Sequence, residues 1–193
     1  MSYRLCLVVC LGIACSGCGA SHHYKQINTG QSLSGSLIVE WMEPDYWLYT
    51  PSKSNPLTFV RADGTVITPQ KMFTDGGSIP RPLWVMKNYS PWGYGPAFII
   101  HDWLFHMQDC GLTGWEDWTV EEAAMVMSEV MKTMMEKPSF DFGDKTTVYL
   151  MYQAVQSPPA KAAWSDRQCK EPPLAMSDFW RPTQRFEITF DDE

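Results

Sequence analysis

Residues 96–108 read PAFIIHDWLFHMQ, and this segment is the most informative about the fold. Proline suits the first turn of a helix, and the residues after Pro96 are apolar on nearly every side of the predicted helix. The stretch therefore predicts a buried helix against which the rest of the chain packs. Its interior holds His101 and Asp102, and an aspartate there is costly to bury unless its carboxylate finds a partner.

Two further helices are predicted on the C-terminal side. Residues 119–122, TVEE, have the pattern of a capping box, and apolar residues then recur at the helical period. A third helix is predicted over 144–155, with an aspartate as its cap. After the two prolines at 158–159 the chain is predicted to be irregular, apart from a strand-like run at 186–190.

The N-terminal side of the buried helix is predicted to be β-structure. Residues 37–68 are rich in β-branched and aromatic side chains. Asp63-Gly64 is a turn signal, so the flanking runs at 57–61 and 65–68 are expected to form a hairpin. The predicted fold class is therefore α+β, with a small antiparallel sheet followed by about three packed helices, in a single domain over 37–193 with an irregular C-terminal tail.

The first residues predict a targeting signal that lies outside the fold. Arg4 precedes an apolar run that is long enough for a signal peptide and too short to span a bilayer. Ser16-Gly17-Cys18 then resembles a bacterial lipobox, although Cys15 stands where leucine is usual. We expect a signal peptide over 1–17 and lipidation of Cys18; an ordinary secretory signal is the alternative.

Residues 18–36 are small and polar, and we expect them to form the lipidated N-terminus and a flexible tether. A tether would give His22 and His23 no structural role. With Lys plus Arg at 15 against 22 for Asp plus Glu, the formal charge is −7. This acidic balance argues against nucleic acid as a partner, and it would not draw the chain to anionic lipids.

An acyl anchor would therefore be needed to hold the protein at a membrane. The expected location is the cell envelope, at the outer membrane or its periplasmic face. Cys110 and Cys169 are the two cysteines beyond residue 18. In an exported protein they form either one disulfide or two buried thiols, and the sequence leaves both open.

His101 and Asp102 are the candidates for chemistry. A histidine in an apolar site beside a carboxylate can serve as a general base. Asp102 shares a helical face with His106, four residues on. The structural alternative is that Asp102 pairs with Arg81 and that His101 is an ordinary core histidine.

A second candidate segment precedes the helix. Asp75-Gly76-Gly77-Ser78 combines polar side chains with glycines that allow close backbone approach. Local turn bonding explains this pattern, and lining a pocket over His101 is the functional alternative. Ser78 lacks the surroundings of a hydrolase nucleophile.

Five blocks carry a family resemblance. They read TDGGSIPRPLW, WGYGPA, HDWLF, EEAAMVM and YLMYQAV, in this order along the chain. Together they resemble an uncharacterised family of phages, prophages and bacteria, catalogued as domain of unknown function 1353, over roughly residues 57–156. Members of that family typically carry His-Asp-x-x-Tyr and, in a later helix, Ala-Asp.

The same layout is similar to small secreted calcium-dependent phospholipases A. The resemblance implies that His101 is the base that activates water and that Asp102 binds calcium, with Asp75 as a further ligand. The sequence departs from the family pattern at two places. Phe105 stands where the family has tyrosine, and Ala124 stands where the family has the aspartate that would orient the histidine. Glu121, one turn earlier, is the residue that we expect could replace this aspartate.

Three functional hypotheses follow. One is a non-enzymatic envelope lipoprotein of phage or prophage origin with an unknown protein partner, and the missing carboxylate at position 124 favours it. The second is a calcium-dependent phospholipase-like hydrolase that uses His101 as its base. The third is a peptidoglycan hydrolase with zinc held by four side chains: His101, Asp102, His106 and Asp75.

Overall fold

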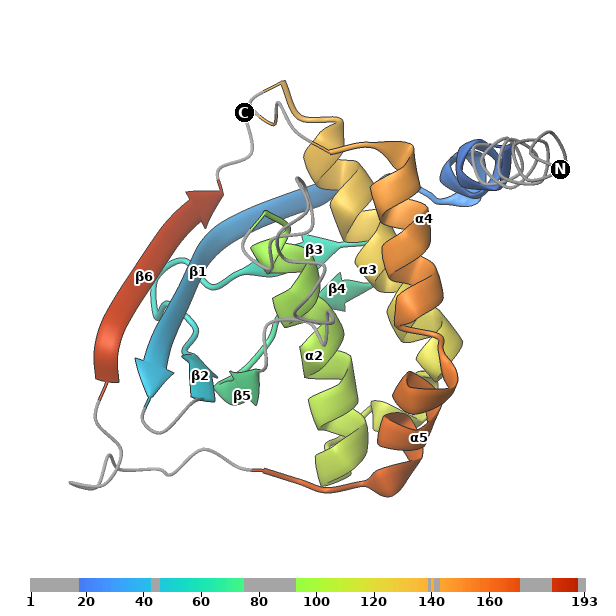
Figure 1. Cartoon of the computed structure of the whole chain (residues 1–193). Coiled ribbons are helices and arrows are strands. Elements are labelled where there is room, and N and C mark those ends of the chain that lie inside the picture. The colour runs from blue at the N-terminus through green and yellow to red at the C-terminus, as the bar shows by residue number, and fades with distance from the viewer. Residues whose placement is uncertain are drawn as a thin grey trace, which may run out of the picture.

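The computed structural model describes residues 18–42, 46–74, 93–138, 140, 143–170 and 182–190. A curled antiparallel sheet packs against a group of helices, so the α+β class is confirmed, with more helices than predicted (Figure 1). The strands are β1 (Ser32–Met42), β2 (Tyr46–Tyr49), β3 (Thr58–Val60), β4 (Val66–Ile67), β5 (Met72–Thr74) and β6 (Pro182–Phe190). The helices are α2 (Gly95–Cys110), the short 3-10 helix η2 (Trp115–Asp117), α3 (Val120–Met135), α4 (Lys145–Ala154) and α5 (Pro158–Asp166).

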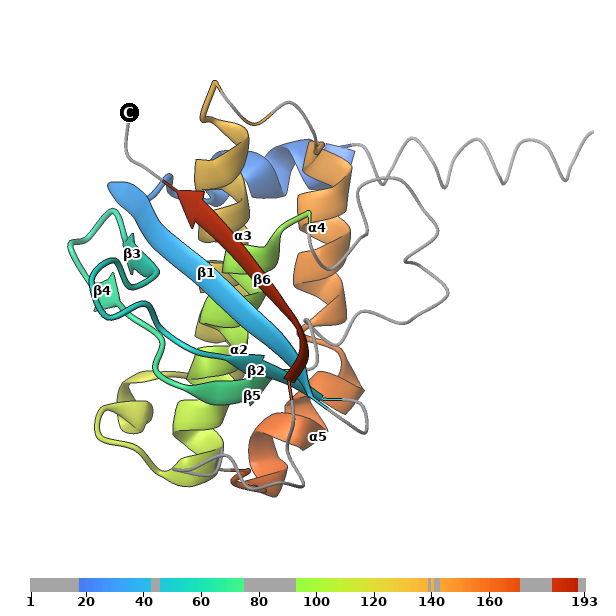
Figure 2. The same ribbon diagram turned by 90° about the vertical axis from the view of Figure 1, so that its left-hand side faces the viewer.

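Strand β1 organises the sheet. Its first residues pair with β3, and from Gly35 onward it pairs with β6 on one side and, near its end, with β2 on the other (Figure 2). The strand changes partners at Gly35, whose φ is +101°. A Cβ there would lie 2.1 Å from the carbonyl oxygen of Pro56, so this position requires glycine.

The predicted hairpin is present as β3 and β4, with Phe59 opposite Ile67. Asp63 forms the turn because its Oδ1 accepts a hydrogen bond from the Thr65 amide at 2.9 Å. Gly64 takes a φ of +89°, which explains the Asp-Gly signal.

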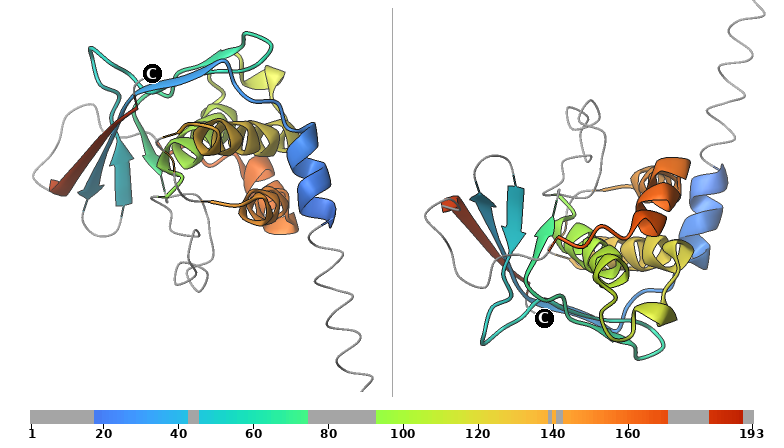
Figure 3. Two further views of the ribbon diagram at one scale, coloured as in Figure 1. Left: turned by 90° about the horizontal axis from the view of Figure 1, so that it is seen from above. Right: turned by 90° about the horizontal axis from the view of Figure 1, so that it is seen from below.

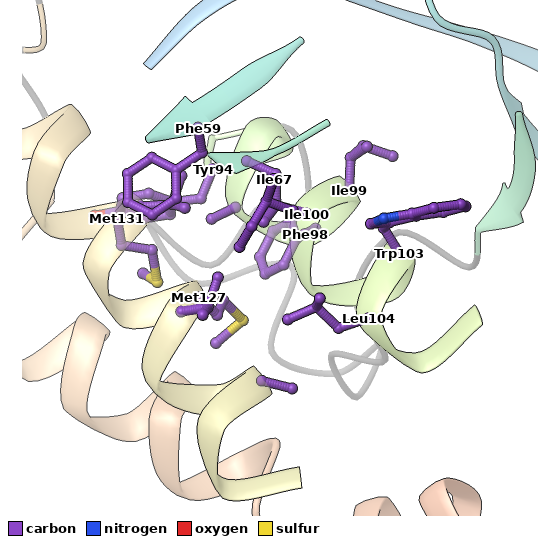
Figure 4. Close-up of a cluster of buried hydrophobic side chains, with 14 of the residues drawn as sticks. Phe59, Ile67, Tyr94, Phe98, Ile99, Ile100, Trp103, Leu104, Met127 and Met131 are labelled. Carbon is purple, nitrogen blue, oxygen red and sulfur yellow. The ribbon is translucent and has the colours of Figure 1, made fainter. Parts of the chain in front are cut away.

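Helix α2 is the buried helix that the sequence predicted. It begins with a proline in its first turn and contacts β5, α3 and α5. Its apolar side chains meet those of the β3–β4 hairpin and of α3 in one core (Figure 4). Central members of this core are Phe59, Ile67, Tyr94, Phe98, Ile100, Leu104, Met127 and Met131.

The caps of the next two helices are as predicted. Thr119 Oγ1 accepts from the Glu122 amide at 3.2 Å, and Glu122 Oε2 accepts from the Thr119 amide at 2.8 Å, which completes the capping box of α3. Asp144 caps α4 through a hydrogen bond from the Thr147 amide at 2.9 Å.

Residues 18–36 do not form the flexible tether that the sequence led us to expect. Residues 18–26 are helical, and 32–36 are already part of β1. Figure 3 shows the N-terminal helix beside α3 and α4. Ala20, His23 and Ile27 are buried, so a minority of well-spaced side chains anchors a segment whose composition is otherwise polar.

The imidazole of His23 is part of this packing. Its ring lies 4.1 Å from that of Tyr152 and 5.6 Å from that of Tyr149, both on α4. Lys132 of α3 donates to the carbonyl oxygens of Ile27 at 2.8 Å and Tyr24 at 3.3 Å. A cation thus satisfies the C-terminal carbonyls of the N-terminal helix.

Docking of this helix is expected to weaken in acid. Burial lowers the pKa of His23 below its ordinary value of 6.5, so the docked state holds a neutral imidazole. The undocked state binds more protons as the pH falls through 6.5, and docking is therefore complete above that pH and lost progressively below it. Protection factors of the amides of residues 19–27, which are corrected for the intrinsic pH dependence of exchange, are expected to fall between pH 7.5 and 5.5, and much less so in His23→Phe. An unchanged pH dependence in that variant would assign the effect to another group.

The C-terminal part also differs from the prediction. Pro158 and Pro159 open α5 instead of starting an irregular tail, because proline fits the first helical turn. The strand-like run at 186–190 is present as the end of β6. Within the described ranges, none of the helices combines the length and apolar character needed to cross a bilayer.

Candidate functional site

A pocket of about 530 Å³ lies between α2, β5 and α5. One wall is a polar stripe of α2 that presents His101, Asp102, His106 and Asp109, with Phe105 among them. The opposite wall is mostly apolar and comes from the end of α4 and from α5: Ala154, Val155, Pro159, Ala160 and Ala163. The stripe exists because residues three and four apart share a face of a helix.

His101 is the most deeply buried polar group of this wall. The residue is 4% exposed. Its Nδ1 lies 3.3 Å from Asp102 Oδ1, and its Nε2 is buried with no hydrogen-bond partner among the described residues. Phe105 packs against the ring with 4.7 Å between centroids. The carboxylate thus faces one ring nitrogen of a residue that lines the pocket, while the other ring nitrogen is buried.

A residue at the end of strand β5 binds the carboxylate of Asp102. Its Oδ2 accepts a hydrogen bond from Thr74 Oγ1 at 2.5 Å, and Thr74 ends β5. The chain therefore leaves β5 directly beside the His101–Asp102 pair. Five predicted site residues lie outside the described part of the structure: Asp75, Gly76, Gly77, Ser78 and Arg81.

The far end of the pocket is acidic. Asp109 lies two turns beyond His101, and its Oδ1 is buried without a hydrogen-bond partner in the described part of the chain. Burial, and secondarily the charge of Asp166, raise the pKa of Asp109, while Lys170 opposes the shift. Sequence reasoning missed Asp109, although its spacing from His101 on a helical face was visible.

Of the two alternatives for Cys110 and Cys169, a disulfide or two thiols, the structure contains the disulfide. Cys110 at the end of α2 is bonded to Cys169, which follows α5. Gln168 and Lys170 flank Cys169 and line the pocket. The disulfide therefore holds this part of the pocket wall to α2.

Glu121, the expected substitute for the missing aspartate, lies beside a lysine of α5. Its Oε1 lies 2.6 Å from Lys161 Nζ, in a pair of which both side chains are about half exposed. This interaction lowers the pKa of Glu121 and directs the carboxylate away from the pocket, whose lining does not include it. Ala124 is fully buried in the core. Glu121 is therefore engaged with Lys161 in this structure, and the carboxylate that faces His101 Nδ1 is that of Asp102.

The described residues do not by themselves assemble the metal ligand sets inferred from sequence, and Asp75, a member of each set, lies outside them. The described residues contain no group of three or more His, Cys, Asp or Glu side chains that could hold a metal ion. Both oxygens of Asp102 already face other groups. His106 lies 3.8 Å from Cys110 Sγ and stacks on Trp103. Its position does not complete a zinc site with His101 and Asp102.

The fold and the site define a class: an α+β protein with a buried histidine beside a partly buried aspartate in the wall of an amphipathic pocket. The chain belongs to the family described as Protein of unknown function (DUF1353), whose model matches residues 54–155. The match includes His101 and Asp102 but not α5. No curated protein and no solved structure matches the chain.

Proposed function

We propose that this protein is an exported lipoprotein of the cell envelope whose pocket hydrolyses an ester, with His101 as general base and Asp102 as the group that orients it. The observation that carries the proposal is the asymmetry of the His101 ring. Nδ1 faces a carboxylate, while Nε2 of this pocket-lining residue is buried without a partner in the described residues. A base held in one tautomer by a carboxylate is the arrangement used for proton abstraction from a nucleophile.

In the proposed reaction, a water molecule next to His101 attacks the ester carbonyl carbon and gives its proton to Nε2. The positive charge that develops on the imidazole is stabilised by Asp102. Collapse of the tetrahedral intermediate breaks the bond to the leaving alkoxide, which takes the proton back from Nε2. The products are a carboxylic acid and an alcohol, and His101 returns to its starting state.

Calcium was the cofactor implied for a phospholipase-like reaction. The described residues alone do not form such a site, because no group of three possible metal ligands occurs among them and both oxygens of Asp102 face other side chains, while Asp75 lies outside the described residues. Hard oxygen ligands of calcium number six or more. The proposed reaction therefore includes no step that depends on calcium, and the role proposed for Asp102 is to orient the imidazole of His101.

The walls of the pocket indicate the class of ester. The α5 wall is mostly apolar and the α2 wall mostly polar, so an amphipathic substrate matches both. A lipid ester combines an acyl chain with a polar group and would be close at hand for an envelope protein. Since α5 lies outside the family match, we expect the substrate preference to be particular to this chain.

Two observations support the proposed location. Cys18, the predicted lipidation site, has an exposed and unbonded thiol. The Cys110–Cys169 disulfide is of a kind that persists mainly in oxidising compartments, such as the bacterial periplasm. A phage or prophage origin rests on the five sequence blocks alone.

The proposal is tested with the full chain on mixed phospholipid vesicles and on a soluble ester, with calcium or with a chelator. We expect release of carboxylic acid that survives chelation. Release that requires calcium would contradict the role given to Asp102. No release from any ester by a folded protein would overturn the enzymatic proposal in favour of a binding role.

A further inference from the structure

We infer that the surface formed by the N-terminal helix (residues 18–26) and α4 lies on the lipid bilayer, held there without a linker by the acyl chain on Cys18. The inference rests on the lipidation in the proposed function and adds the orientation of the domain. It follows from the position of Cys18, which already belongs to a helix that packs on the domain.

The N-terminal helix is fixed at both ends. At its start, a Cβ on Gly19 would lie 3.5 Å from the Tyr149 ring of α4, so the residue after the lipidated cysteine already contacts the domain. At its end, Lys132 binds the carbonyl oxygens of Tyr24 and Ile27. Between them His23 is buried against α4. No free chain therefore separates the lipid attachment from the folded domain.

Since one residue spans at most about 3.6 Å, the bilayer surface must come close to α4 once the lipid is inserted. The exposed part of α4 suits that position. Leu150, which follows Tyr149, is a large apolar side chain that is 43% exposed. In the proposed orientation it would contact the bilayer.

Two exposed lysines lie on this surface, although the overall charge is −7. Lys25 of the N-terminal helix and Lys145 of α4 are both exposed, and Lys145 Nζ lies 5.1 Å from the Tyr24 ring. Lysines beside an aromatic ring are typical of side chains at the level of lipid headgroups. The exposed apolar residues of β6 lie on the opposite side of the molecule from this surface (Figures 1 and 3).

The test uses two matched positions in the full chain anchored on vesicles. Leu150→Cys and Ile188→Cys carry an environment-sensitive fluorophore at residues of nearly equal exposure, 43% and 45%. Brominated lipids are expected to quench the label at 150 several-fold more than the label at 188. His23→Glu, which releases the helix and creates a tether, is expected to abolish that difference while Cys18 keeps its lipid.

The experiments distinguish failure of the proposed anchoring from failure of the proposed orientation. Mass spectrometry that finds no lipid on Cys18 overturns the proposed anchoring and this inference together. A lipidated Cys18 with equal quenching at both positions overturns the inference alone. A label at 150 that is shielded from aqueous quencher but not reached by brominated lipid would show that a protein covers α4, which also contradicts it.

Discussion

Replacing His101 with asparagine is expected to lower kcat/KM for ester hydrolysis by about 10²- to 10⁴-fold, the usual contribution of a general base. The asparagine amide can still donate to Asp102 from the position of Nδ1, while the group at Nε2 is lost. The variant therefore removes the proposed base and keeps the hydrogen bond that holds it. Initial rates on the best substrate, compared with those of the wild type, measure the effect.

The matched control is His22→Asn, the same substitution at an exposed histidine of the N-terminal helix. It is expected to keep wild-type rates. Melting temperatures of both variants separate loss of chemistry from loss of folding. A His101→Asn variant that is folded and retains more than about a tenth of the activity would remove His101 from the proton-transfer step.

Replacing Arg61 with methionine is expected to lower the free energy of unfolding by about 3 to 5 kcal/mol, the cost of leaving a buried charge unpaired. Arg61, which follows β3, binds Glu129 of α3 with two hydrogen bonds of 2.7 and 2.9 Å. Glu129 is 3% exposed, and its carboxylate would lose this cation. Chemical denaturation followed by fluorescence measures the change.

The double variant Arg61→Met, Glu129→Met is the control. Because a buried ion pair is itself costly to desolvate, replacing both partners is expected to restore most of the stability that the single variant loses. If the double variant were as unstable as Arg61→Met, the loss would come from packing of the Arg61 side chain, which also lies 5.9 Å from the Trp118 ring.

Local signals account for the elements that were predicted correctly. The capping box at Thr119 and the Asp63-Gly64 turn place each partner within three residues, so a single sequence contains the whole interaction. The N-terminal helix was missed because its stability comes from elsewhere. Lys132 and the α4 tyrosines that hold it lie more than a hundred residues away along the chain.

The candidate site was also only partly predictable from the sequence. His101 and Asp102 were identifiable because an adjacent pair in an apolar helix is unusual on any reading. The pocket that gives them a function was not predictable, because its second wall is α5 and the sequence predicted no helix there. Glu121 was assigned from a sequence pattern, and its actual partner, Lys161, lies on that same unpredicted helix.

The proposed role of His101 as a base depends on its tautomer, which can be measured without a substrate. Nitrogen NMR of the imidazole at alkaline pH distinguishes a proton on Nδ1 from a proton on Nε2. We expect the Nδ1–H form, hydrogen-bonded to Asp102, with Nε2 unprotonated, and a loss of this preference in Asp102→Asn. A proton on Nε2 in the wild type would contradict the proposed mechanism, because Nε2 would then be a donor instead of a base.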